Sequence, residues 1–352
     1  MARSTATDPP PAETRAEEPP PRTPWRPGPA VALLGVVLAA LLLVPPAVGA
    51  LTGGGDGTQL KGLRMMVPNS PGGGYDVTAR AAATAMEDSG LSGPVEVFNL
   101  PGAGGTVGLN RTVNEAGDGR LLMSMGLGVV GSVYSNESAT TLRDVTPIAR
   151  VTEETEVVVV GRDSPFADIG QFLAAWRANP ASVPVGGGSS VGGPDHLAPM
   201  LMARGAGVDP RAVTYVPYDG GGELMAAVLG DKVGVGVSGL GEFADQVESG
   251  DLRVLAVTAG ARVPGVDAPT LREAGVDVEF TNWRGIVAPP GLSGEQRAEL
   301  VGALDALHVT PEWRDVLARN GWQDAYLPGD AFGAFLADED TRVAGVLREL
   351  GL

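Results

Sequence analysis

The chain has 352 residues and 43% hydrophobic content, which is enough for two domains with buried cores. Its 25 Lys and Arg residues against 42 Asp and Glu give a net charge of −17, which argues against nucleic acid and anionic membrane surfaces as partners. Because cysteine is absent and the histidines are His196 and His308 alone, disulfides, thiol catalysis and Cys-type zinc sites are excluded, and we expect neither a metal site nor a cofactor.

Residues 1–61 read as an export segment with a tail before it and a spacer after it. The composition of 1–29, mostly Pro, Ala, Glu, Thr and Arg, predicts a disordered cytoplasmic tail. Residues 30–50 contain a continuous apolar run and end in Ala-Val-Gly-Ala, which resembles a signal-peptidase site. The run is short for a membrane span of about 20 residues, so a cleaved signal peptide and an uncleaved anchor both remain open. Arginines before the run predict an extracytoplasmic body, secreted or tethered to the outer face of the cell membrane, with 51–61 as the spacer.

From residue 62 onward, short apolar runs alternate with helical patterns. This order indicates an α/β fold with parallel or mixed sheets flanked by helices. The part after 293 is predicted to be helical throughout, with an amphipathic helix over 295–307 and further helices opening at Pro311 and Gly329. The expected strands are 63–67, 95–98, 121–125, 157–160, 183–185, 213–216, 233–237 and 252–258.

Two segments of the body look like crossings between lobes. The valine strand 157–160 and the segment 282–290 stand near the two ends of the body, so the chain is predicted to leave lobe 1 at the first and return at the second. The predicted division is 62–157 plus 281–352 for lobe 1 and 158–280 for lobe 2. The acidic group Glu153, Glu154 and Glu156 is expected to be a solvated approach to the first crossing.

A glycine-rich loop follows the first predicted strand and opens the first helix. It reads Val67-Pro-Asn-Ser70-Pro-Gly72-Gly73-Gly74-Tyr75-Asp76. Glycines let a ligand approach the backbone, and the first N–H groups of a helix have no partner within it, so such a loop can cradle an anion. The alternative is a tight turn capped by Asp76. In either case the acid is expected to hold the loop and cap the helix and not to touch an anionic ligand, which it would repel.

A second loop repeats this pattern after the next strand. It reads Asn99-Leu-Pro-Gly102-Ala103-Gly104-Gly105-Thr106-Val-Gly108. Loops that follow successive strands of one sheet lie together at its carboxyl edge, where open α/β sheets bind ligands. The two loops are therefore predicted to lie side by side.

These two motifs resemble the paired signatures of the tripartite tricarboxylate transporter solute receptors, the TctC or Bug family. The likeness runs from about residue 62 to the end of the chain. Several spaced motifs in the same order make it more specific than any one glycine run; the others are 188–197, 216–221, 252–258 and 283–291.

The resemblance implies a two-lobed receptor of the type II periplasmic-binding-protein kind that holds a small carboxylate such as citrate between its lobes. It also implies delivery to a separate membrane permease, no enzymatic activity and no catalytic residues, and we expect a monomer. Backbone amides of the two loops would grip the carboxylate, and polar groups of lobe 2 would face it. Arg284, beside Trp283 on the return crossing, is the cation expected nearest to it; a surface or lobe-bridging arginine is the alternative. The implied ligand-binding residues are Ser70, Gly72, Gly73, Gly74, Tyr75, Asp76, Ala103, Gly104, Gly105, Thr106, Ser189, Ser190, Asp195, His196 and Ser238.

Lobe 2 departs from the family pattern. Many relatives carry Ser or Gln where Pro194 and Asp195 stand, and a polar or aromatic pair where Gly236 and Ser238 stand, which puts the substrate in doubt. A hydrogen-bonded structural role is the alternative for His196.

Other functions remain open alongside the transport receptor. Gly188-x-Ser190-x-Gly192 follows a strand as a nucleophile elbow would, so a secreted serine hydrolase with Ser190 as nucleophile and His308 as base is one alternative. A ligand-sensing receptor without transport is another. Gly234-x-Gly236-x-x-Gly239 matches a dinucleotide motif by spelling, but it lies inside a valine run and lacks the following acidic residue.

Overall fold

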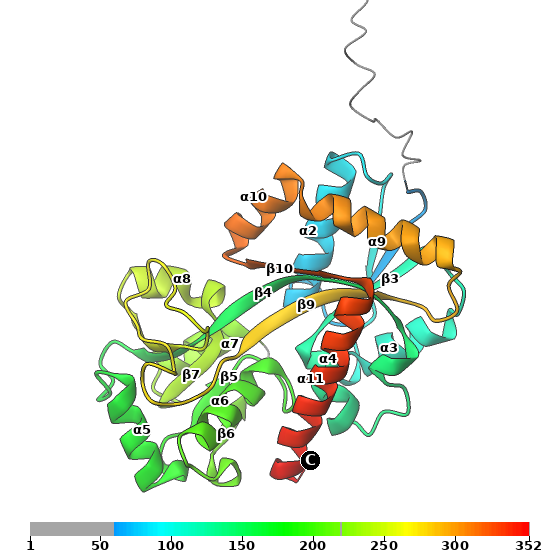
Figure 1. Ribbon diagram of the computed structural model, residues 1–352. Helices are drawn as coiled ribbons and strands as arrows, with labels where there is room; N and C mark the ends of the chain where they lie inside the picture. The colour runs from blue at the N-terminus through cyan, green and yellow to red at the C-terminus, as the bar shows by residue number, and fades with distance from the viewer. Residues whose placement is uncertain (1–59, 219, 352) are drawn as a thin grey trace, which may run out of the picture. The chain divides into compact units, whose positions relative to one another are not determined.

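The first sheet of the fold gathers the strands from both ends of the body. In the computed structural model, the structure describes residues 60–218 and 220–351 (Figure 1). Strands β1, β2 and β3 pair in parallel, and β9 pairs antiparallel with β3 and with β4, which in turn pairs with β10. The bounds are β1 Arg64–Val67, β2 Glu96–Asn99, β3 Leu121–Gly126, β4 Thr146–Gly161, β9 Thr281–Ala288 and β10 Gln323–Pro328.

The second sheet is built on the end of the same strand β4. Strands β7 and β8 pair antiparallel with it, and β5 lies parallel to β7 and β6. Its other strands are β5 Val185–Gly187, β6 Tyr215–Pro217, β7 Val235–Gly239 and β8 Leu252–Val257.

Strand β4 joins the two sheets because its partner changes along its length. Residues 146–155 pair with β9, and residues 156–161 pair with β7 and β8. We refer to the elements on the first sheet as lobe 1 and those on the second as lobe 2. Figure 1 shows β4 and β9 as two long neighbouring strands. The lobe boundaries predicted from the sequence stay a prediction.

Helices cover both sheets and bury their apolar side chains. In lobe 1, α2 packs on β1 and β3, and α11 packs on β4 and α4; in lobe 2, α6 and α7 pack on β7. The α-helices are α2 Gly74–Asp88, α3 Thr106–Asn114, α4 Leu127–Ser135, α5 Ile169–Ala178, α6 Pro194–Gly205, α7 Gly221–Leu229, α8 Leu240–Glu248, α9 Gly294–His308, α10 Pro311–Asn320 and α11 Gly329–Leu350. Short 3-10 turns are η1 Ala103–Gly105, η2 Leu142–Asp144, η3 Pro180–Ser182 and η4 Pro210–Ala212.

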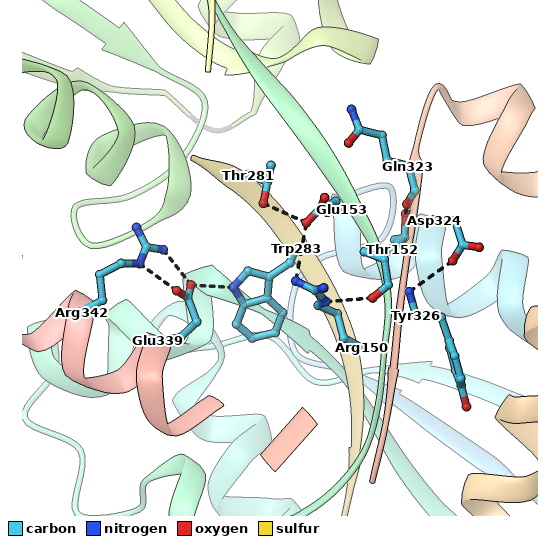
Figure 2. A network of polar contacts seen from close by, with 11 residues as sticks. Arg150, Thr152, Glu153, Thr281, Trp283, Gln323, Asp324, Tyr326, Glu339 and Arg342 are labelled. Carbon is cyan, nitrogen blue, oxygen red and sulfur yellow. Dashed lines mark hydrogen bonds and ion pairs between the residues drawn. The ribbon is translucent and has the colours of Figure 1, made fainter. Parts of the chain in front are cut away.

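Polar contacts fasten α11 to the shared strands (Figure 2). The Trp283 indole N–H on β9 donates to Glu339 on α11 at 2.8 Å, and Arg342 also donates to that carboxylate at 2.7 Å. Two residues before Trp283 on β9, the Thr281 hydroxyl donates to Glu153 on β4 at 3.0 Å. The Trp283–Glu339 contact thus joins β9 to α11, and the Thr281–Glu153 contact joins β9 to β4.

Three sequence predictions need correction. The part after 293 is not helical throughout, because β10 forms a strand on β4 between α10 and α11. The first crossing strand is not 157–160 but starts at Thr146. Two of the three acids expected to be solvated are buried: Glu154 is 5% exposed and Glu156 is fully buried, since β4 lies inside the sheet with neighbours on both sides, whereas Glu153 is half-buried.

The export segment and the tail lie outside the described residues, as does most of the spacer. Over 60–218 and 220–351, no helix combines the length and the apolar character needed to cross a membrane.

Candidate ligand-binding site

The loop before α2 is held in shape by Asp76. Gly72 has φ +86°, which favours glycine, and Gly73 is the N-cap residue of α2, so the helix begins at Gly74. Asp76 is therefore in the first turn and not at the cap; its Oδ2 accepts from the Gly72 N–H at 2.9 Å. The guanidinium of Arg80 and the amide of Asn99 donate to the same carboxylate. Burial opposes ionisation, but these hydrogen bonds outweigh it and lower the pKa of Asp76 to about 2.

The second glycine loop lies against the first, as the sequence predicts. Gly102, Ala103, Gly104 and Gly105 all have positive φ, with Ala103 at 45°. A Cβ on Gly105 would lie 3.4 Å from Pro68 of the first loop. Turns of this kind orient successive N–H groups toward one side and commonly bind anions. The starts of α2 and α3 thus form one continuous region at the carboxyl edge of β1 and β2.

Lobe 2 contains a copy of the first loop. The strand, loop and helix over 185–205 have the same backbone course as 64–88, with Gly192 at φ +89° in the place of Gly72 and Gly193 as N-cap in the place of Gly73. His196 takes the place of Asp76: its Nδ1 accepts from the Gly192 N–H at 3.2 Å. Burial lowers the pKa of His196 to about 4, so the ring is neutral and holds the loop.

In this copied motif, Asp195 occupies the position of Tyr75. The Asp195 carboxylate accepts from the Gly188 N–H at 2.7 Å and from the Ser238 hydroxyl at 2.6 Å. The same hydroxyl is 2.8 Å from Glu242 Oε2. A hydroxyl has one hydrogen and can donate to only one of them, so the arrangement favours a further proton on the Asp195 and Glu242 pair.

Burial raises the pKa of the acids around Ser238. It raises that of Asp195 to about 6, against hydrogen bonds from Ser238 and Gly188. For Glu242, burial and the neighbouring Asp195 raise the pKa to about 7. The pKa of Glu156 is raised well above its usual range by burial and by the charges of Asp195 and Glu154. Below about pH 6 these acids therefore hold protons that exposed carboxylates would have lost.

Arg284 is the buried cation of the region. Its Nη2 donates to Glu154 at 2.9 Å, and both side chains are 7% exposed. A Cβ on Gly74 would lie 2.9 Å from the same nitrogen, so the guanidinium lies beside the start of α2. Nη1 has no hydrogen-bond partner among the described residues. The prediction that this arginine comes nearest to the loops agrees with its place beside Gly74.

The side chain of Tyr75 connects the lobe 1 loop to α4. The backbone amides of Val129 and Gly128 face its hydroxyl, and burial raises its pKa to about 12 against the effect of Arg284. Gly131, one turn further along α4, touches lobe 2: a Cβ there would lie 1.8 Å from the Gly192 carbonyl oxygen. Backbone atoms of both lobes meet at this point.

The predicted site residues fall into three groups by exposure. Ser70, Gly72, Gly74, Ala103, Gly104 and Ser190 are exposed, whereas Gly73, Tyr75 and Ser189 are half-buried. The buried ones are Asp76, Gly105, Thr106, Asp195, His196 and Ser238. Whether each touches a ligand stays a prediction.

Sequence reasoning missed Glu154, Glu156 and Glu242 as members of this region. The two β4 acids are two positions apart and so share one face of a strand otherwise rich in valine, a spacing that points to a common polar site. Glu242 follows directly on the glycines at the start of α8 and had no comparable pattern around it.

The elbow reading of Ser190 has little support from its surroundings. His196, the histidine of the same helix start, uses Nδ1 to hold Gly192. His308 lies at the end of α9 with its ring stacked on Tyr326 and Nδ1 3.3 Å from Asp324. Both histidines thus have structural partners.

Fold and site together define a two-lobed solute receptor of the periplasmic-binding-protein type. The model of the tripartite tricarboxylate transporter family receptor, TctC, matches residues 78–352, and the chain belongs to this family. Protein BugT of Bordetella pertussis is 28% identical over 328 residues, which are 91% of this chain and 97% of BugT.

Solved structures agree with this assignment. A TctC solute-binding protein from Polaromonas, without ligand, has a TM-score of 0.69 and 27% identity, covering 82% of this chain and 99% of that one. MatC from Rhodopseudomonas palustris, with bound malate, has a TM-score of 0.69 at 24% identity and covers 81% and 98%. The second match supports the fold alone. The family and the fold expected from the loop motifs are confirmed.

Proposed function

We propose that the protein is an extracytoplasmic receptor, without enzymatic activity, that captures a small di- or tricarboxylate such as citrate between its lobes and delivers it to a permease of the tripartite tricarboxylate type. The observation that carries this proposal is the pair of glycine loops before α2 and α3, which lie against each other at Pro68 and Gly105, with Arg284 beside the start of α2. MatC, solved with bound malate, shares the fold.

Hydrogen bonds from these loops can supply the binding free energy that a receptor needs. A hydrogen bond to a charged acceptor contributes about 1.5–3 kcal/mol, and micromolar affinity needs about 8 kcal/mol. A few amides of the two loops therefore suffice, together with Arg284 Nη1, which has no hydrogen-bond partner within residues 60–218 and 220–351.

Ligand-induced stabilisation of the full-length chain tests the proposal. A ligand that binds only the folded state raises the unfolding temperature by mass action. We expect one or more members of a panel of citrate, malate, succinate, glutarate and adipate to raise it, with saturation at higher concentration. If no carboxylate of the panel changes the unfolding temperature or gives heat in calorimetry, the proposal is wrong.

A pair of glycine substitutions locates the grip. Gly74→Ala adds a methyl group beside Arg284 Nη2 at the first residue of α2. Gly294→Ala adds one at the first residue of α9, where no atom lies within 4 Å. Both alanines suit a helix start, so we expect similar unfolding temperatures but about tenfold weaker carboxylate binding in Gly74→Ala only. Equal binding by the two variants would place the grip elsewhere.

Uptake in whole cells separates transport from sensing. A transport receptor predicts that deletion of the gene abolishes uptake of the ligand found in the panel. A sensor predicts normal uptake with the same binding. A fluorophosphonate probe that labels wild type but not Ser190→Ala would instead support a hydrolase.

A further inference from the structure

Four acidic side chains in the candidate site have no part in gripping a carboxylate. Glu154 and Glu156 come from β4, Asp195 from α6 and Glu242 from α8. The charges of Asp195, Glu154 and Glu242 disfavour ionisation of Glu156, and those of Asp195 and Glu154 disfavour ionisation of Glu242. Arg284 is the cation that faces them, and Glu154 already pairs with it. The remaining acids would repel a ligand that is anionic throughout.

Glu156 is the member of this group that most needs a partner. It is fully buried in the middle of β4, yet neither Oε1 nor Oε2 has a hydrogen-bond partner among the described residues. Buried polar atoms are nearly always hydrogen-bonded, so an unpaired carboxyl group here points to a donor that the site receives from outside. Of the charged groups that act on it, Asp195, Glu154 and Glu242 are acids and supply no such donor, and the guanidinium of Arg284 donates to Glu154 instead.

The helix N-termini of the two lobes differ in the charge of the side chains beside them. In lobe 2, the carboxylate of Glu242 lies against Gly221 at the start of α7, and Glu154 lies against Gly239 and accepts from the Gly241 N–H at the start of α8. The lobe 2 termini are thus already neutralised by acids of the chain. In lobe 1, the start of α2 has the guanidinium of Arg284 beside it. An anionic group therefore suits lobe 1, and lobe 2 offers acceptors.

We propose that the solute carries a protonated amino group as well as a carboxylate, and that Glu156, Asp195 and Glu242 receive this amino group while the α2 and α3 loops hold the carboxylate. This inference rests on the proposed function and narrows its substrate class to amino-bearing carboxylates. An ammonium group brings three N–H donors and one positive charge, which match the unpaired oxygens of Glu156 and the surplus of acid around Ser238.

A metal ion fits the arrangement less well. Over the residues that the structure describes, no three acidic or histidine side chains converge in a way that could hold one. The geometry favours a small organic cation whose donors reach separate carboxyl groups.

Matched ligand pairs test the inference on the full-length chain. The pairs are butyrate with 4-aminobutyrate, succinate with aspartate, and glutarate with glutamate, which differ by one amino group on the same carbon skeleton; malate serves as a hydroxyl control beside aspartate. We expect the amino member of at least one pair to bind about tenfold or more tightly than its partner, the effect of a charged hydrogen bond.

Isosteric variants identify the acids responsible. Glu156→Gln should reduce affinity for the amino member about tenfold and leave its partner nearly unchanged. Because it removes a buried, unpaired carboxyl group, Glu156→Gln should also raise the unfolding temperature of the free protein. Glu153→Gln is the control: it lies on the same strand, half-buried, with Thr281 as its partner (Figure 2), and should change neither ligand preference.

The outcomes separate the two proposals. Tighter binding of amino members that is lost in Glu156→Gln supports the inference. Binding of unsubstituted carboxylates as tight as that of their amino partners, or an amino preference that survives Glu156→Gln, overturns the inference and leaves the carboxylate receptor standing. If neither set binds, the proposed function fails and the inference with it. Binding that requires added Mg²⁺ or Ca²⁺ overturns the inference in favour of a metal site.

Discussion

Asp76 and His196 show how the same backbone can be held by different side chains. Each is in the first turn of its helix and accepts a hydrogen bond from the glycine four residues before it. Asp76 is balanced by the guanidinium of Arg80, which is partly exposed. At the position of Arg80, the lobe 2 helix has the buried Met200, so a neutral acceptor suits that loop better than a carboxylate.

Asp76→Asn should therefore destabilise the protein and leave ligand contacts largely intact. The pKa of this carboxyl is lowered to about 2, so its contribution is present above its ordinary pKa of 3.8 and is lost as pH falls toward 2. The shift corresponds to about 2 kcal/mol at neutral pH. We expect denaturant unfolding at pH 7 to show a loss of this order, with ligand affinity within about threefold of wild type. A large loss of affinity with unchanged stability would mean that the acid contacts the ligand.

The acids around Ser238 predict a pH dependence of opposite sign. The folded pKa values of Asp195 and Glu242 are raised to about 6 and about 7, so the folded state binds more protons than the unfolded state above about pH 4. Unfolding free energy should fall as pH rises from about 4 to about 7 on account of these groups, which face Glu154, Glu156 and Arg284.

The double variant Asp195→Asn, Glu242→Gln isolates that effect. His196 acts in the same pH range with the opposite sign, because its lowered pKa makes the folded state resist protonation, but it is present in both proteins. We expect the difference in unfolding temperature between the double variant and wild type to grow as pH rises from about 4 to about 7. Asp168→Asn, at an exposed helix cap, should show no such trend. A difference that is constant with pH would show that the two acids titrate normally.

Among the elements, the loops were predictable and the shared strand was not. The two glycine loops of lobe 1 are specified locally, since strand, glycines and helix start follow one another within a few residues. The length of β4 depends on pairing with β9 and β10, which are more than one hundred residues away. Burial of Glu154 and Glu156 follows from that pairing, so their spacing in the sequence indicates a shared face but not that this face is buried.

Helix α4 is not evident from the sequence, for a different reason. Its sequence, Leu-Gly-Val-Val-Gly-Ser-Val-Tyr-Ser, is rich in glycine and β-branched residues, which disfavour helices. Packing against α11 and β3 stabilises it nonetheless. Two of its glycines leave room for neighbours that a side chain would displace: Gly128 faces the Tyr75 hydroxyl, and Gly131 faces the Gly192 backbone.

The contact between α4 and the lobe 2 loop yields a test at this scale. Gly131→Ala would place a methyl group 1.8 Å from the Gly192 carbonyl oxygen and force the two segments apart. We expect about tenfold weaker ligand binding, because the lobes then meet less closely around the site. Gly302→Ala, in the interior of α9 with no atom within 4 Å, is the control and should bind normally with equal or slightly higher stability. Normal binding by Gly131→Ala would mean that this contact is not needed in the bound state.

For the molecule as a whole, the net charge is negative, whereas the charge at the start of α2 favours an anion. The chain carries a net charge of −17, whereas the start of α2 presents backbone amides and Arg284. Surface charges are screened over about 10 Å at 0.1 M ionic strength, and buried pairs such as Arg284 and Glu154 are screened much less. Association from a distance therefore responds to the total charge, and retention in the site responds to the buried groups.

This difference predicts that salt changes the association rate of one class of ligand and not of the other. For a dianion such as succinate, raising ionic strength from about 20 mM to about 200 mM should increase the association rate, because screening weakens repulsion by the acidic surface. A neutral zwitterion such as 4-aminobutyrate should associate at nearly the same rate in both conditions. Dissociation rates should change little for either, since the contacts that hold the ligand are buried. Stopped-flow measurement of tryptophan fluorescence on the full-length chain would give both rates. An association rate for the dianion that falls with salt would show that the local field of the α2 loop and Arg284 extends into solvent and dominates the approach.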